Sequence, residues 1–250
     1  MTCARPSLRV LNTRPTEDAA ELYKLLGEIG YEVISEPLLT VQFNGPNPPP
    51  INSFQAVLFT SRNGVRAFAH ASDERDTMAF AVGDATSREA EIIGFDTVQN
   101  AAGNLENLVA LVMAQLNPSD GPLLHISANV VAGDLSNRLN AAGFDVKNSV
   151  LYETVASKKL STRTKKLLKN NKLDVIVLFS PRTARTFVSL LRQGELLDFC
   201  KGLIVVCLSE AVAAEVSDIA GLRILIANEP TLESVLQMFR GIYCGDFESG

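Results

Sequence analysis

Two segments of this sequence place hydroxyl and arginine side chains directly after an apolar run. The first, LFTSRNGV, begins at Leu58, and the second, LFSPRTA, begins at Leu178. A helical pattern follows each of them, so the polar residues lie where a buried strand gives way to a helix. The first turn of a helix has unpaired backbone N–H groups that favour a carboxylate or a phosphate. The two segments therefore predict anion-binding turns.

Similar polar turns follow most of the other predicted strands. They are Thr13-Arg14, Thr60-Ser61-Arg62-Asn63, Gly83-Asp84-Ala85-Thr86, Ser127-Ala128-Asn129, Ser180-Pro181-Arg182-Thr183 and Ser209. Ligands of open α/β sheets bind at the carboxyl ends of the strands. Together the turns favour a cleft that binds several anionic groups. For each single turn the alternative is that Ser, Thr, Asn or Asp only caps a helix.

The sequence lacks the motifs of several common kinds of site. It has no GxGxxG after a strand and no GxxxxGK[ST], so dinucleotide and P-loop nucleotide binding lack support. It has no GxSxG elbow. Two histidines, His70 and His125, and four cysteines without a CxxC pair make a poor metal-ligand set. Both histidines are interpreted as structural or surface residues, and any chemistry is expected to use hydroxyls, arginines and backbone amides.

Composition narrows the class of protein. The chain has 250 residues, of which 46% are hydrophobic and 20% charged, and its net charge is −5. This balance argues against nucleic-acid binding as the main role. No apolar run approaches the roughly 18 residues of a membrane-spanning helix, and the N-terminus does not resemble a secretion signal. The cysteines are interpreted as reduced thiols of a cytoplasmic protein. They are Cys3, Cys200, Cys207 and Cys244.

Short β-rich apolar runs alternate with helical patterns along the whole chain, which is typical of an α/β protein with parallel sheets. The predicted strands are Arg9–Asn12, Ala56–Phe59, Ala79–Val82, Leu123–Ile126, Val175–Phe179, Leu203–Cys207 and Arg223–Ile226. Amphipathic helical stripes begin at Leu22 and at Leu232. Thr86 and Glu89 are predicted to form a capping box at the start of another helix.

The two halves of the chain resemble each other. RVLNTRP resembles LLHISAN, VLFTSRNGVRAF resembles VLFSPRTARTF, and AFAVGDATSREAEIIGF resembles VVCLSEAVAAEVSDIAGL. A repeat of this length predicts two similar α/β domains that arose by duplication. EPLLTV and SVLYET also correspond, and Tyr152 in the second replaces an aliphatic residue of the first. These segments lie where the chain crosses between the two predicted domains. A tyrosine there can pack its ring while its hydroxyl stays in solvent, or it can present a proton donor to a cleft.

An ordered series of motifs resembles the uroporphyrinogen-III synthase family. The series is NTRP, LFTSRNGV, AVGDAT, NLENL, HISAN, VLYET, LFSPRTA, CLSEAVA and ANEPTLESVL, and it runs from about Leu8 to Phe239. The resemblance implies two flavodoxin-like α/β domains joined by a two-stranded linker. The first domain would contain residues 1–36 and 156–250, the second 43–149, and the linker 37–42 and 150–155.

The resemblance also implies an activity. The family converts the linear tetrapyrrole hydroxymethylbilane to uroporphyrinogen III, with loss of water and inversion of ring D, and uses neither a metal nor an organic cofactor. The many carboxylates of this substrate suit the polar turns. Tyr152 matches the family's tyrosine and is implied to assist departure of the hydroxyl group. The implied or candidate substrate-binding residues are Arg14, Thr60, Ser61, Asn63, Thr86, Ser127, Ser180 and Ser209.

A second hypothesis belongs to another class. A duplicated α/β chain with a cleft could be a non-catalytic binding or regulatory module for an anionic metabolite. Under either hypothesis we expect a monomer that binds a small molecule, and neither nucleic acid nor a membrane. An assay with hydroxymethylbilane separates the two hypotheses.

Overall fold

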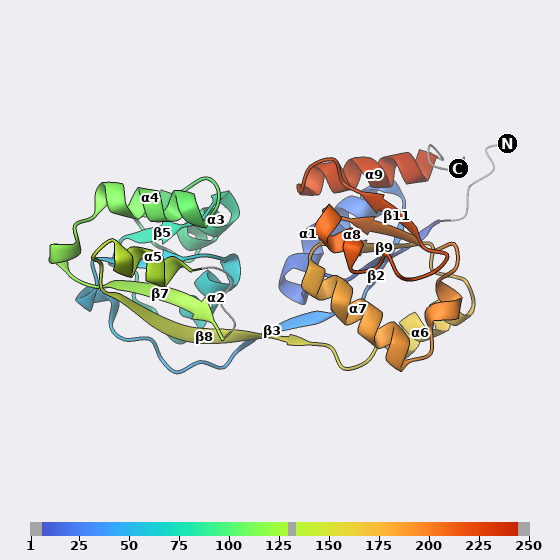
Figure 1. Cartoon of the computed structure of the whole chain (residues 1–250), viewed down its shortest axis with the longest axis horizontal. Coiled ribbons are helices and arrows are strands. Elements are labelled where there is room, and N and C mark those ends of the chain that lie inside the picture. Colours follow the sequence, from blue (N-terminus) through green and yellow to red (C-terminus); the bar gives the residue numbers. More distant parts are fainter. Residues whose placement is uncertain (1–6, 130–133, 245–250) are drawn as a thin grey trace. The chain divides into compact units, whose positions relative to one another are not determined.

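The computed structural model of the chain describes residues 7–129 and 134–244. The chain divides into two compact units. Unit 1 contains Met1–Thr40 and Val155–Gly250, and unit 2 contains Val41–Thr154. Both ends of the chain thus build unit 1, and the middle builds unit 2 (Figure 1).

Unit 1 has a five-stranded sheet in the order β11-β10-β9-β1-β2, and all its neighbouring strands are parallel. The strands are β1 (Arg9–Asn12), β2 (Glu32–Ser35), β9 (Val175–Leu178), β10 (Ile204–Cys207) and β11 (Arg223–Ile226). The central strand β9 reads VIVL and is buried throughout. A strand covered on both faces has no solvent side, so its sequence is apolar without alternation.

Helices cover both faces of this sheet (Figure 1). They are α1 (Thr16–Ile29), α6 (Thr162–Lys169), α7 (Pro181–Gln193), α8 (Glu210–Ala214) and α9 (Leu232–Cys244), with a short 3-10 helix at Leu197–Cys200. Helices α1 and α9 share a core with Val10 and Val175. Helices α6, α7 and α8 share another with Leu11 and Ile176. Alternate residues of a strand point to opposite faces, so the two cores lie on opposite sides of the sheet.

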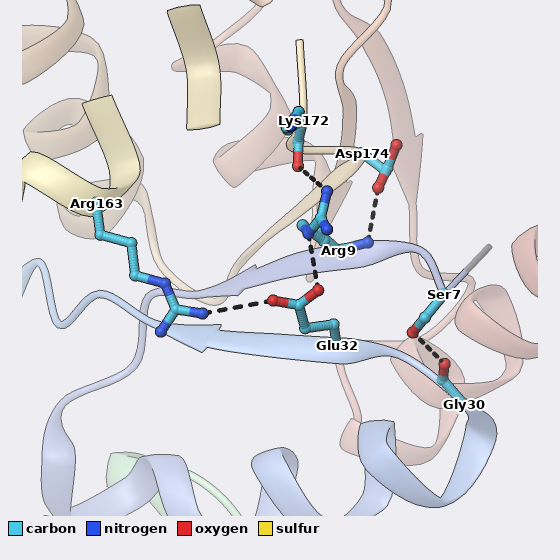
Figure 2. A network of polar contacts seen from close by, with 7 residues as sticks. All are labelled: Ser7, Arg9, Gly30, Glu32, Arg163, Lys172 and Asp174. Carbon is cyan, nitrogen blue, oxygen red and sulfur yellow. Dashed lines mark hydrogen bonds and ion pairs between the residues drawn. The ribbon is translucent and has the colours of Figure 1, made fainter. Parts of the chain in front are cut away.

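A polar network ties the first strand to its two neighbours at the amino ends of the strands (Figure 2). The Arg9 Nε donates to Glu32 Oε2 at 2.7 Å, and the Arg9 backbone N–H donates to Asp174 Oδ2 at 2.7 Å. Arg163 reaches the other carboxylate oxygen of Glu32 at 3.4 Å. These groups are partly exposed, so each ion pair contributes at most about 1 kcal/mol. Their main effect is to fix the register of β1 between β2 and β9.

Unit 2 has a six-stranded sheet in the order β3-β8-β7-β4-β5-β6. The strands are β3 (Leu39–Phe43), β4 (Ala56–Phe59), β5 (Ala79–Ala81), β6 (Val98–Asn100), β7 (Leu123–Ala128) and β8 (Val146–Ala156). Strands β8, β7, β4, β5 and β6 pair in parallel. The chain passes between the units twice, once within β3 and once within β8.

The helices of unit 2 also lie on both faces of its sheet (Figure 1). They are α2 (Arg62–Ala71), α3 (Asp84–Ile92), α4 (Leu105–Gln115) and α5 (Leu135–Ala141), with short 3-10 helices at Ile51–Ser53 and Pro118–Asp120. Helices α2 and α3 share a core with Val57 and Leu124. Helices α4 and α5 share the opposite core with Leu58 and Leu123.

Corresponding strands have the same order in the two sheets. In unit 1 the strands run β2-β1-β9-β10-β11, and in unit 2 they run β8-β7-β4-β5-β6, with β3 added at the edge. The similar segments VLFTSRN and VLFSPRT span β4 and β9, which occupy the same central position. This correspondence confirms the prediction of two similar α/β domains with parallel sheets.

The structure corrects some predicted elements. The capping box of Thr86 and Glu89 is wrong, because α3 begins at Asp84 with Gly83 at its N-cap, and Thr86 is buried in the first turn. Glu89 instead forms an ion pair with Arg66 at 2.8 Å. The chain enters α3 directly after β5, and the spacing of Thr86 and Glu89 does not indicate where this helix begins. The prediction also missed β2 and β6, whose short edge sequences, EVIS and VQN, lack a distinct apolar run.

Candidate functional site

The carboxyl ends of the unit 2 strands bring Ser61 and Tyr152 into contact. β4 ends at Phe59, and Ser61 is the N-cap of α2, where its Oγ accepts a hydrogen bond from the Gly64 N–H at 3.1 Å. The same Oγ lies 2.8 Å from the Tyr152 hydroxyl. Ser61 therefore caps a helix and also pairs with the phenol. The two interpretations of this turn, cap and site residue, do not exclude each other.

Tyr152 comes from β8, and only 7% of it is exposed. Burial raises the pKa of its phenol, and the hydrogen bond with Ser61 opposes this shift only in part. The phenol is therefore protonated at neutral pH. A neutral, fixed phenol can donate a proton to a leaving oxygen, whereas it is a poor base or nucleophile.

The other candidates of unit 2 differ in exposure. Thr60 directly precedes Ser61, Asn63 lies two residues after it, and both are half-buried. Thr86 is 5% exposed, and Ser127, near the end of β7, is 2% exposed. Among residues 7–129 and 134–244, the Oγ of Ser127 has no hydrogen-bond partner, an arrangement that costs free energy unless another group supplies the bond. These residues follow or end the adjacent strands β7, β4 and β5.

The candidates of unit 1 lie at the carboxyl ends of three adjacent strands, β1, β9 and β10. The Arg14 guanidinium lies over the Phe179 ring, 4.6 Å from its centroid. Ser180 caps α7, because its Oγ accepts from the Thr183 N–H at 3.1 Å. Ser209 is the N-cap of α8, but its side chain makes no capping hydrogen bond. Capping thus accounts for Ser61 and Ser180, and it does not account for Ser209.

The predicted residues thus form two groups, one at the carboxyl edge of each sheet. Beside the unit 2 group, Glu153 accepts hydrogen bonds from Asn44 at 2.6 Å and from Asn129 at 3.2 Å. Neither Asn44 nor Glu153 was predicted from the sequence. The motif VLYET places Glu153 beside Tyr152, and this adjacency is the signal that could have found it.

One hollow of unit 1 is lined by Arg192, Leu197, Asp198, Lys201, Asp218, Ile219, Ala220 and Gly221. Several of these residues precede β10 and β11, so the hollow lies at the amino edge of the sheet, opposite Arg14 and Ser180.

Within residues 7–129 and 134–244, no group of three or more His, Cys, Asp or Glu is placed to bind a metal. In the same residues no helix is long and apolar enough to cross a membrane.

The fold and these strand-end groups define a class: duplicated α/β proteins with parallel sheets and polar carboxyl edges. A family model described as uroporphyrinogen-III synthase HemD matches residues 20–237. The chain belongs to the uroporphyrinogen-III synthase family, as its motifs predict.

Individual proteins agree with this assignment. The chain is 27% identical over 203 residues to the uroporphyrinogen-III synthase of Chlorobaculum parvum. The aligned residues cover 76% of this chain and 81% of that protein. The fold of this chain is similar to that of the crystal structure of uroporphyrinogen-III synthetase from Helicobacter pylori, with a TM-score of 0.66 and 16% identity. The match covers 94% of this chain and 99% of the Helicobacter pylori chain. A mutant uroporphyrinogen III synthase from Thermus thermophilus gives a TM-score of 0.55 at 14% identity, with coverage of 97% and 100%.

Proposed function

We propose that this protein is a uroporphyrinogen-III synthase of tetrapyrrole and heme biosynthesis. It acts as a hydro-lyase, without a metal or an organic cofactor, and cyclises hydroxymethylbilane with inversion of ring D. Family membership over residues 20–237 supports the reaction class. The observation that carries the assignment of a proton donor is the buried Tyr152 hydroxyl, 2.8 Å from Ser61 at the carboxyl edge of the unit 2 sheet.

The first chemical step is loss of the terminal hydroxyl group as water. The phenol of Tyr152 gives its proton to the departing oxygen, and the C–O bond breaks as the adjacent pyrrole nitrogen supplies its electron pair. This leaves an electrophilic azafulvene. The raised pKa of Tyr152 keeps the proton on the phenol until the oxygen takes it.

Ring inversion then follows from where ring D attacks. Its substituted carbon adds to the azafulvene and forms a spiro intermediate, which reopens and closes again in the inverted sense. The final ring proton passes to the Tyr152 phenolate, which restores the phenol and balances the proton that left with water. The protein's contribution here is orientation, because simple closure of the same chain would give the type I isomer.

The carboxyl edges of both units are proposed to bind the substrate's carboxylates. The N-termini of α2 and α7 present backbone N–H groups with a favourable dipole. The Arg14 guanidinium, 4.6 Å from the centroid of the Phe179 ring, supplies a charged donor. Thr60, Asn63, Thr86, Ser127, Ser180 and Ser209 are proposed as further hydroxyl and amide partners.

The deciding experiment is turnover of freshly prepared hydroxymethylbilane, with the isomers separated after oxidation to porphyrins. We expect the protein to raise both the rate and the share of the type III isomer above the spontaneous reaction. A saturable interaction with the bilane that leaves rate and isomer ratio at their spontaneous values would instead establish the non-catalytic binding module.

The proposed compartment is the cytoplasm, and the proposed state is a monomer. Cys200, Cys207 and Cys244 are free thiols, as suits a reducing compartment. Burial raises the pKa of Cys200 to about 11 and that of Cys207 to about 12, so both thiols are unreactive at neutral pH. Cys3 lies outside the described residues. Sedimentation equilibrium measures the oligomeric state.

A further inference from the structure

The strand that carries Tyr152 is irregular at the residue before it. In the pairing of β7 with β8, Ser127 is opposite Val150 and Ala128 is opposite Tyr152, so Leu151 has no partner on β7. This is a β-bulge, in which one strand has one residue more than the other. Bulges change the direction of the side chains that follow them.

The effect of this bulge can be read from the two cores of unit 2. Val146, at the start of β8, packs in the core formed with α4 and α5. Strict alternation would direct Tyr152 to that same side, because the two positions differ by an even number of residues. Instead Leu151 and Tyr152 both pack in the core formed with α2 and α3. The bulge is therefore what turns the phenol toward the N-cap of α2, where Ser61 lies.

Gly45 lies directly against the bulge. Its N–H donates to the Leu151 carbonyl at 3.1 Å. A Cβ on Gly45 would lie 2.2 Å from the Val150 carbonyl oxygen and 2.4 Å from the Leu151 Cα. Both are backbone atoms, which no side-chain rotation can move away. Any residue other than glycine must displace the bulge or its own segment.

Hydrogen bonds on the other side complete the support of this segment. The Asn129 N–H donates to the Tyr152 carbonyl at 3.0 Å. The next residue, Glu153, is held by the amide groups of Asn44 and Asn129. The backbone around Tyr152 is thus fixed from the β3 side by Asn44 and Gly45 and from the β7 side by Asn129.

We propose that Gly45 is a positioning residue for Tyr152: it admits the Leu151 bulge, and the bulge directs the phenol to Ser61. This inference rests on the proposed function for its effect on turnover. Gly45 does not touch the substrate in this role, so substitution changes kcat through Tyr152 and leaves substrate binding largely unchanged.

The test is a double-mutant cycle of Gly45→Ala with Tyr152→Phe, measured as kcat and KM. We expect Gly45→Ala to lower kcat on the order of 10- to 100-fold, the cost of a small misplacement of a catalytic group, with KM nearly constant. In the Tyr152→Phe background the same substitution should have almost no further effect, because the group that it misplaces is already absent. Gly27→Ala is the matched control, since a Cβ there has nothing within 4 Å, and it should leave kcat unchanged.

A second variant guards against a Gly45→Ala protein that does not fold. Asn44→Ala removes the hydrogen bond to Glu153 without adding an atom near the backbone. It should lower kcat by about two- to fivefold in the wild-type background, which corresponds to the lower part of the range for one exposed hydrogen bond, and not in Tyr152→Phe. Equal losses in both backgrounds, or no loss in either, would overturn the proposal.

A spectroscopic readout separates this inference from the proposed function. Titration of the tyrosine absorbance at 295 nm, compared with Tyr152→Phe, reports the phenol of residue 152 without any substrate. In Gly45→Ala that phenol should titrate closer to the ordinary tyrosine pKa, because it leaves its buried place. An unchanged titration would contradict the positioning role even if turnover is observed. A wild-type protein without synthase activity would refute the function and leave this measurement valid.

Discussion

The phenol of Tyr152 is held by one hydrogen bond and by the packing of its ring in a core of unit 2. We expect Tyr152→Phe to lower kcat about 10²-fold, the lower range for loss of a general acid. The unfolding free energy and KM should change little, since only the oxygen is removed. Stopped-flow turnover with isomer analysis measures this loss. A variant with unchanged kcat would exclude the phenol from the mechanism and leave the function standing.

A second titratable residue of unit 2 makes its stability depend on pH. His125 Nδ1 lies 2.9 Å from Asn148 Oδ1, and its Nε2 has no hydrogen-bond partner in the described part of the chain. Burial lowers the pKa of this imidazole. As the pH falls below about 6.5, the unfolded chain therefore takes up the proton before the folded chain does. The unfolding free energy should fall through that range, down to the folded-state pKa.

Urea unfolding at pH 7.5 and at pH 5.5 checks this prediction. His125→Gln should remove a part of the loss seen in the wild type over this interval. If His125→Gln loses as much stability as the wild type, His125 is not the group responsible.

At the scale of the elements, α6 begins on a carboxylate that comes from a distant part of the chain. Glu36 follows β2 and is 6% exposed. It accepts from the Ser161 N–H at 2.8 Å and from the hydroxyls of Ser161 and Thr164. A carboxylate at a helix N-terminus also interacts favourably with the helix dipole. Glu36 thereby joins the first segment of unit 1 to the second.

We expect Glu36→Gln to lower the unfolding free energy by about 1–3 kcal/mol, because an amide cannot accept from all of these donors. Denaturant unfolding followed by circular dichroism gives this value. Glu106→Gln is the control: Glu106 pairs with Arg138 at 3.5 Å on the surface, and its loss should cost at most about 0.5 kcal/mol. Similar losses for the two variants would mean that the Glu36 network adds no stability.

At the scale of the whole molecule, one order of corresponding strands occurs twice, with the strands of unit 1 supplied by both ends of the chain. The repeat in the sequence predicted this duplication because each copy keeps the same apolar strands and polar strand ends. Strand β4 and the residues Arg9–Asn12 and Arg223–Ile226 agree with the prediction to the residue. β4 reads AVLF and β11 reads RILI, and such runs of successive apolar residues predict a strand from the local pattern alone.

The sequence alone determined the buried strands, the duplicated α/β class, the family motifs and the polar residues at the strand ends. Each of these depends on residue type and on spacing along the chain. Only the tertiary structure decided that Tyr152 meets Ser61, since side-chain direction in β8 depends on a bulge opposite β7 and on the close approach of Gly45. Such pairings join residues far apart in sequence, and a one-residue shift in register reverses every side chain beyond it.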